Sequence, residues 1–128
     1  MTSAETQVKM GQIFEDLKVL EVKLQNASAE LGKAMAQEET CNAGLAEVNR
    51  KLKAVKSNDL VEVKEFLAAQ KDVETVESFL EQSKAHRIIL LNTVQVLAKT
   101  QKHLQMGYEN LGMQLAKMEH NIINLPKQ

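Results

Sequence analysis

Three histidines, His86, His103 and His120, are the side chains best suited to bind a metal ion, and they recur every seventeen residues. On one straight helix this spacing separates neighbouring histidines by about 25 Å, because each residue rises about 1.5 Å. A zinc ion needs its ligands within about 2 Å. No cysteine or pair of carboxylates stands at ligand spacing beside them, so we expect surface histidines, no metal site and no other cofactor.

The single cysteine, Cys41, is the other potentially reactive side chain. No basic group adjoins it on a rigid loop, which argues against a low-pKa nucleophile. We expect a small buried hydrophobic residue, with a disulfide between chains as the alternative. Glycine-rich phosphate loops and the HExxH, CxxC and EF-hand patterns are absent from the sequence. The sequence therefore predicts a protein without enzymatic activity.

Apolar residues recur at alternating spacings of three and four residues in both halves of the chain, a pattern that we call the seam. In the first half the seam comprises Met10, Ile13, Leu17, Leu20, Leu24, Ala27, Leu31, Ala34, Glu38, Cys41, Leu45, Val48, Leu52 and Val55. In the second half it comprises Phe66, Ala69, Val73, Val76, Leu80, Ser83, Arg87, Leu90, Val94, Leu97, Gln101, Leu104, Tyr108, Leu111, Leu115, Met118, Ile122 and Leu125. A repeat of about 3.5 residues sustained over this length is typical of coiled-coil helices.

Polar side chains interrupt the seam most prominently at Glu38, Arg87 and Gln101. Polar residues at core positions often fix the register and orientation of a coiled coil at some cost in stability. We therefore interpret these three residues as register-setting, with contact to a specific partner as the alternative for Arg87 and Gln101. We expect Arg87 to pair with Glu81, with Glu30 or with an acid of another chain.

A chain reversal is predicted near the midpoint of the sequence. Ser57, Asn58 and Asp59 are consecutive residues whose side chains compete for backbone hydrogen bonds and favour turns. A helix running straight on would place Asp59 and Glu62 in the dry seam, which is costly for carboxylates. The same two acids instead suit a capping box at the start of a second helix. Turn chemistry and charge burial thus both favour a hairpin.

The predicted fold is all-α, a long antiparallel two-helix coiled-coil hairpin. It is expected to form a single helical domain, with a helix over 3–56, a turn over 57–59 and a helix over 60–124 within 1–128. Residue i would then face roughly residue 115 − i of the other helix. One continuous helix is the first alternative, because the two halves of the seam share a seven-residue register, and a bundle of shorter helices is the second.

A hairpin of two helices leaves many of these apolar side chains without an intramolecular partner, and exposed apolar patches usually mark protein contacts. Val19 is expected level with Val96, and the last dozen residues of the second helix are expected to extend beyond the first. The predicted partner or oligomer interface comprises Val19, Val22, Ile88, Ile89, Val96, Met113, Leu115, Met118, Ile122, Ile123 and Leu125. We expect association into a four-helix or larger bundle. Docking onto a different assembly and a recessed core in a more compact fold are the alternatives.

Charge and hydropathy restrict the classes of partner. A net charge of −1 argues against a general nucleic-acid or anionic-membrane binder. The longest apolar run, residues 88–91, is far shorter than the about 20 residues that cross a bilayer. The polar N-terminal stretch lacks the apolar core of a secretory signal. We expect a cytoplasmic protein, or a part of a particle assembled inside the cell.

The sequence thus favours a non-enzymatic structural or adaptor protein. It would self-associate and dock into a larger protein assembly, such as a viral particle or a secretion machine; this choice rests on architecture rather than on any motif. The alternative is a chaperone-like module that grips apolar segments of a client protein, helped by methionines such as Met106, Met113 and Met118. A nucleic-acid-associated regulator is the third hypothesis.

Overall fold

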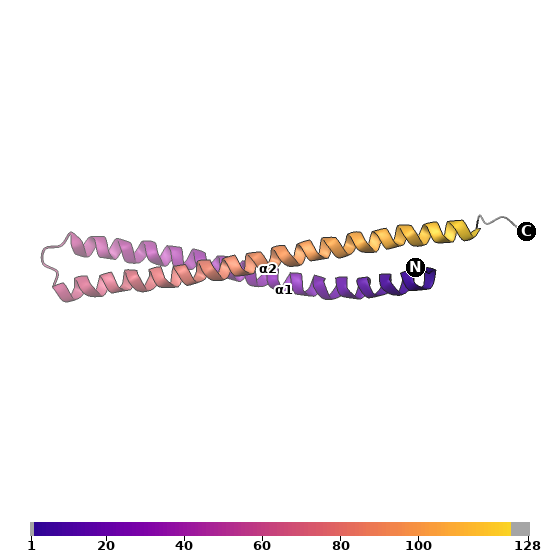
Figure 1. Ribbon diagram of the computed structural model, residues 1–128. Coiled ribbons are helices and arrows are strands. Elements are labelled where there is room, and N and C mark those ends of the chain that lie inside the picture. Colours follow the sequence, from indigo (N-terminus) through magenta and orange to yellow (C-terminus); the bar gives the residue numbers. More distant parts are fainter. Residues whose placement is uncertain (1, 124–128) are drawn as a thin grey trace, which may run out of the picture. The chain divides into compact units, whose positions relative to one another are not determined.

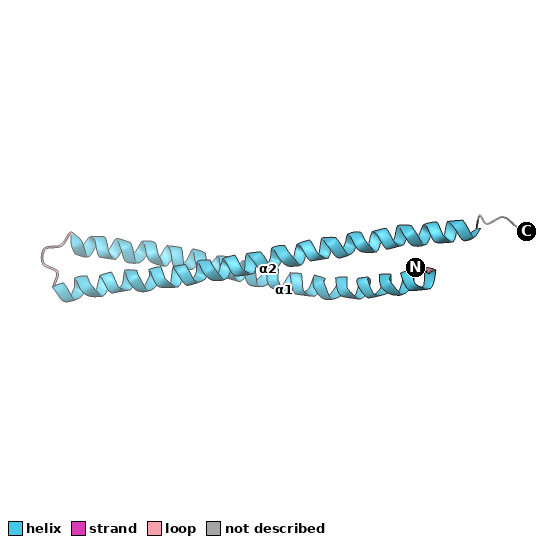
Figure 2. Ribbon diagram, in the orientation of Figure 1, coloured by secondary structure: helices cyan, strands magenta, loops and turns pink. Residues whose placement is uncertain are grey.

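The computed structural model of the protein describes residues 2–123, with side chains up to residue 121. Two helices, α1 (Ser3–Lys56) and α2 (Val63–Ile123), make up almost all of this range, and no strand occurs in it. The helices pack against each other as a hairpin, joined by a short loop (Figures 1 and 2). The predicted all-α helical hairpin is confirmed, and the continuous helix is excluded.

The start of α1 is capped by a threonine. Thr2 Oγ1 accepts a hydrogen bond from the backbone N–H of Glu5 at 3.1 Å, which satisfies one of the free donors at a helix N-terminus. The hydroxyl of Thr6 donates to the Thr2 carbonyl at 2.9 Å, and Thr6 is fully buried. The inward-facing row of α1 therefore begins one turn before Met10, where the sequence pattern first shows it.

The turn is longer than predicted, because an asparagine side chain holds it. Asn58 Oδ1 accepts a hydrogen bond from the N–H of Leu60 at 3.0 Å, and the Asn58 carbonyl accepts from Val61 at 3.2 Å. These bonds keep the backbone in a turn where helix was predicted from residue 60. Helix α2 begins at Val63, with the Glu62 carbonyl accepting from Phe66 at 3.2 Å. The turn thus covers 57–62 instead of 57–59.

The chain divides into two compact units, which we describe separately. Unit 2 is residues 28–92 and contains the turn; unit 1 combines residues 1–27 with residues 93–128. In each unit, a segment of α1 packs antiparallel to a segment of α2 (Figure 1). Each unit is therefore a pair of helical segments that contact each other along one interface.

The longer turn changes which residues face each other. In unit 1, a Cβ atom on Gly112 would lie 3.5 Å from Met10 Cε, and the rings of Phe14 and Tyr108 are 6.4 Å apart. The residue numbers of both pairs add to 122, not to the predicted 115. Because the difference is one heptad, the same stripes still face each other. Val19 therefore does not lie level with Val96, contrary to the prediction from the sequence.

The seam forms the inner side of both units. Every seam position from Met10 to Met118 is buried or half-buried. Only three apolar residues within the described range, Ala34, Val73 and Leu80, are nearly inaccessible, and all three lie in unit 2. A pair of helices encloses its interface on two sides only, so most seam side chains keep part of their surface in water. Neither helix, as far as it is described, has a stretch long and apolar enough to cross a membrane.

Candidate functional site

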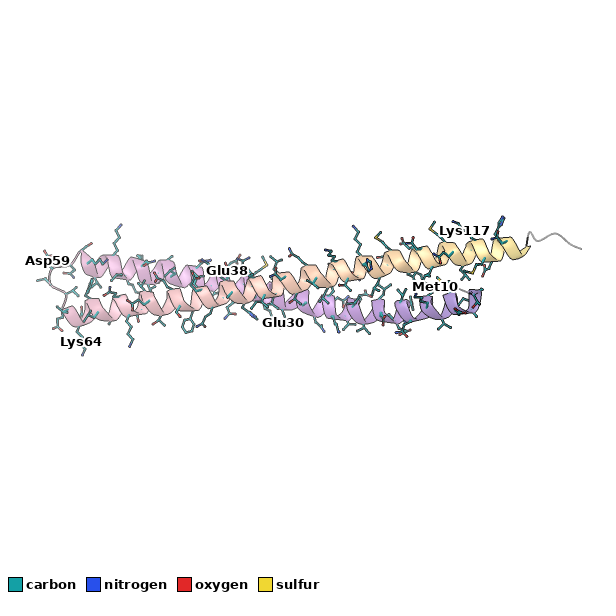
Figure 3. All side chains as sticks on the ribbon, viewed as in Figure 1. Met10, Glu30, Glu38, Asp59, Lys64 and Lys117 are labelled. Carbon is teal, nitrogen blue, oxygen red and sulfur yellow. The ribbon has the colours of Figure 1, made fainter. Side chains whose placement is uncertain are left out.

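A polar layer crosses the seam in unit 2, built from both helices. The guanidinium of Arg87 donates a charge-assisted hydrogen bond to the carboxylate of Glu38. One turn away, the Cys41 thiol and the Ser83 hydroxyl lie 3.7 Å apart. Figure 3 labels Glu38 on α1. Because both pairs join α1 to α2, the seam's polar residues in this unit satisfy one another across the hairpin.

The two charges of this layer are partly withdrawn from solvent. The side chain of Glu38 is 16% exposed and that of Arg87 is 33% exposed. At this depth water screens the attraction between the two charges less than on the surface, and removing one partner leaves the other inadequately solvated. Arg87 pairs with neither Glu81 nor Glu30, the two intrachain acids that the sequence suggested. The pairing of Glu38 with Arg87 follows from the longer turn.

A groove follows the same interface along one face of unit 2, and we call it the unit 2 groove. It contains two hollows of about 440 and 470 Å³. The first is lined by Gln37, Thr40, Cys41, Gly44, Val76, Phe79, Gln82, Ser83 and His86. The second is lined by Val48, Arg50, Lys51, Ala54, Val55, Glu65, Ala68, Ala69 and Asp72. The floor of the second hollow is formed by small or β-branched residues.

Heptad spacing shows that the two hollows share one face. On α1 the edge is formed by residues seven apart, Gln37, Gly44 and Lys51. On α2 the edge residues are likewise seven apart: Glu65, Asp72, Phe79 and His86. Residues at this spacing stay on one side of a coiled-coil helix. The two hollows of the unit 2 groove therefore lie on one face of the unit.

Phe79 is the largest apolar side chain on the edge of the groove, and it is 56% exposed. Gly44, which lines the same hollow from α1, presents no side chain there. A Cβ atom on Gly44 would meet Val76 Cγ1 at 3.8 Å, an ordinary contact distance. The missing side chain thus leaves a notch on α1, and the phenylalanine forms a projection on α2.

The charges around the groove have opposite signs on the two helices. Arg50 and Lys51 line it from α1, whereas Glu65 and Asp72 line it from α2. The Arg50 guanidinium also donates two hydrogen bonds to the Glu47 carboxylate, at 2.7 and 3.1 Å. These hydrogen bonds, together with the positive charge of Arg50, lower the pKa of Glu47. The basic edge of α1 and the acidic edge of α2 are the main electrostatic feature of this face.

The predicted interface residues are distributed over both units. Those with described side chains that are at least 50% exposed are Val19, Val22, Val96 and Met113 in unit 1, and Ile88 and Ile89 in unit 2. Leu115 and Met118 are half-buried. Leu115 shares a hollow of about 340 Å³ with Met10 and Phe14. The expectation that Leu115 extends beyond α1 is therefore wrong. The side chains of Ile122 and Ile123, and Leu125 altogether, lie outside the described residues.

Five other residues singled out from the sequence lie in the described part of the chain. Gln101 is half-buried in the seam of unit 1. Cys41 is a free, half-buried thiol. His86, His103 and His120 are exposed. Within residues 2–123, no cluster of three or more His, Cys, Asp or Glu side chains is arranged to hold a metal ion.

The unit 2 groove was not predicted from the sequence, because its edges lie outside both the seam and the exposed aliphatic positions. Phe79 and Gly44 lie beside the seam rather than on it. A usable signal was present, since Asp72, Phe79 and His86 form a row with seven-residue spacing. Such flanking rows contact additional helices in bundles. Known proteins offer no further guidance, as the chain matches no family model, no curated protein and no solved structure.

Proposed function

We propose that this protein is a non-enzymatic structural or adaptor component that self-associates through its exposed apolar surface and docks into a larger protein assembly. A viral particle or a secretion machine is the kind of assembly that this architecture suits. The proposal rests on three features: a helical hairpin, apolar side chains left outside its interface, and a polar layer that selects one alignment of the helices.

The exposed surface is the observation that carries the proposal. The chain has an accessible surface of 9772 Å². A compact monomer of its mass, 14.3 kDa, exposes about 6,800 Å² by the usual scaling. Large apolar side chains contribute to this surface: Val19, Phe79, Ile88 and Val96 are each at least 50% exposed. Apolar surface of this extent usually marks protein contacts.

The test is the mass of the full chain in solution. Sedimentation equilibrium over a wide concentration range should show a monomer converting into one defined oligomer, with the dimer as the smallest. Burial of the exposed apolar side chains would drive the association, so the association should persist in high salt. A chain that stays monomeric at its highest soluble concentration would contradict self-association.

A chaperone-like module is the second candidate, favoured by exposed methionines in both units. Met35, Met106 and Met113 are each more than half exposed, and methionine side chains adapt to varied apolar partners. The two functions differ in their response to an unfolded client. A structural component keeps its oligomeric mass when client is added, whereas a chaperone binds the client and suppresses its aggregation at comparable concentration.

A further inference from the structure

We infer that the unit 2 groove binds the same groove of a second copy of this chain, about a twofold axis that runs along the helices. In this arrangement α1 of one copy faces α2 of the other at the same level, and both turns lie at the same end. The inference rests on the proposed self-association, and it specifies the surface and the orientation.

Shape complementarity is the first argument. The contacts of Cys41 with Ser83 and of Gly44 with Val76 place Gly44 close to the level of Phe79 within one chain. A twofold axis along the helices preserves levels and exchanges α1 with the partner's α2. Phe79 of each copy then faces the Gly44 notch of the other. Large side chains that fill well-packed pockets on the partner are the usual anchors of a protein interface.

The floor of the groove supports a close approach. Between the helices of unit 2, the second hollow exposes Val48, Val55 and three alanines, Ala54, Ala68 and Ala69. Small side chains allow two helical layers to come near each other, because they do not hold the facing ridges apart. A second pair of helices can therefore complete a four-helix bundle over this surface.

Charge selects the orientation. The same twofold axis places Lys51 of one copy, beside the Arg50–Glu47 ion pair, opposite Glu65 and Asp72 of the other, and it does so twice. The other face-to-face twofold, perpendicular to the helices, sets α1 against the partner's α1, and with its axis at the level of the second hollow it brings the two Lys51 side chains together. Like charges across an interface suppress that association. The groove is thus electrostatically self-complementary in the alignment about the axis along the helices.

The first experiment compares Phe79→Glu with the matched control Met35→Glu by sedimentation equilibrium of the full chain. Both residues are more than half exposed in unit 2, but Met35 does not line the groove. We expect Phe79→Glu to weaken dimerisation by about 30-fold or more, as for a central interface anchor, and Met35→Glu to leave it unchanged. Unchanged circular dichroism verifies that both variants fold.

Two failures remain distinguishable. If the wild-type protein dimerises and Phe79→Glu dimerises equally well, the groove is not the interface, although self-association stands. If the wild-type protein is monomeric, the proposed function fails together with this inference.

The second experiment tests the orientation without changing Phe79. Two single-cysteine chains are made in a Cys41→Ser background, one with Lys51→Cys and the other with Asp72→Cys, and one chain carries a size tag. After mixing and mild oxidation, we expect disulfides mainly between the two kinds of chain. A preference for two Lys51→Cys chains would overturn the proposed axis, since it would place α1 against α1. Absence of any interchain disulfide from a dimeric mixture would overturn the interface.

Discussion

Leu80→Ala should lower the free energy of unfolding by about 2–5 kcal/mol, the usual range for removing a buried leucine side chain. Leu80 is only 6% exposed and belongs to the small nearly inaccessible core of unit 2. A pair of helices has few other buried contacts to compensate for the cavity. The measurement is urea denaturation followed by circular dichroism, at one protein concentration, because association also contributes to stability.

Leu67→Ala provides the control for this prediction. Leu67 lies on the same helix in the same unit, but it is 55% exposed. Its truncation should cost well under 1 kcal/mol in the monomer, because little buried surface is lost. Equal losses for the two variants would show that Leu80 does not face α1.

Arg87→Met should lower the free energy of unfolding by about 1–3 kcal/mol, because it leaves the Glu38 carboxylate without its partner. Glu38 is mostly withdrawn from solvent, at 16% side-chain exposure. The methionine retains most of the apolar contacts of the arginine side chain, so the loss reports mainly on the charge. Urea denaturation of the Arg87→Met variant under the same conditions measures this loss in the free energy of unfolding.

The double variant Glu38→Leu with Arg87→Met separates stability from specificity. Replacing both members of a half-buried ion pair by apolar residues is often neutral or stabilising, so the double variant should regain the stability lost by Arg87→Met. It should also form a less uniform set of oligomers, since two of the three residues that we expect to set the register are gone. A double variant as unstable as the single one would show that Arg87 does not act through Glu38.

The seam pattern was sufficient to predict the inner face of both helices. Every described seam position, including the polar Glu38, Arg87 and Gln101, is buried or half-buried. Periodicity determines which side of a helix faces its neighbour, because side chains seven residues apart stay on one side. It does not determine which residue of the other helix lies opposite, since any shift by whole heptads preserves the pattern.

The register depended on a local detail of the turn. Asp59 and Glu62 resemble a capping box, but α2 begins only at Val63, after a turn in which Asn58 Oδ1 accepts a hydrogen bond from the N–H of Leu60. The resulting later start of α2 brings Arg87 to Glu38 rather than to Glu30. Asn58, Asp59 and Glu62 all have side chains that can bond nearby backbone groups, and the sequence alone does not reveal which of them sets the start of the helix.

The alignment of the hairpin is tested most directly by a single added cysteine, Ser83→Cys. Cys41 and Ser83 are 42 positions apart in the sequence, yet their side-chain sulfur and oxygen atoms are 3.7 Å apart. Mild oxidation at low protein concentration should therefore give a disulfide within one chain, with monomer mass on a non-reducing gel and no free thiol. On a continuous helix the same residues would be about 63 Å apart. Disulfides only between chains, or two persistently free thiols, would contradict the antiparallel hairpin and its register.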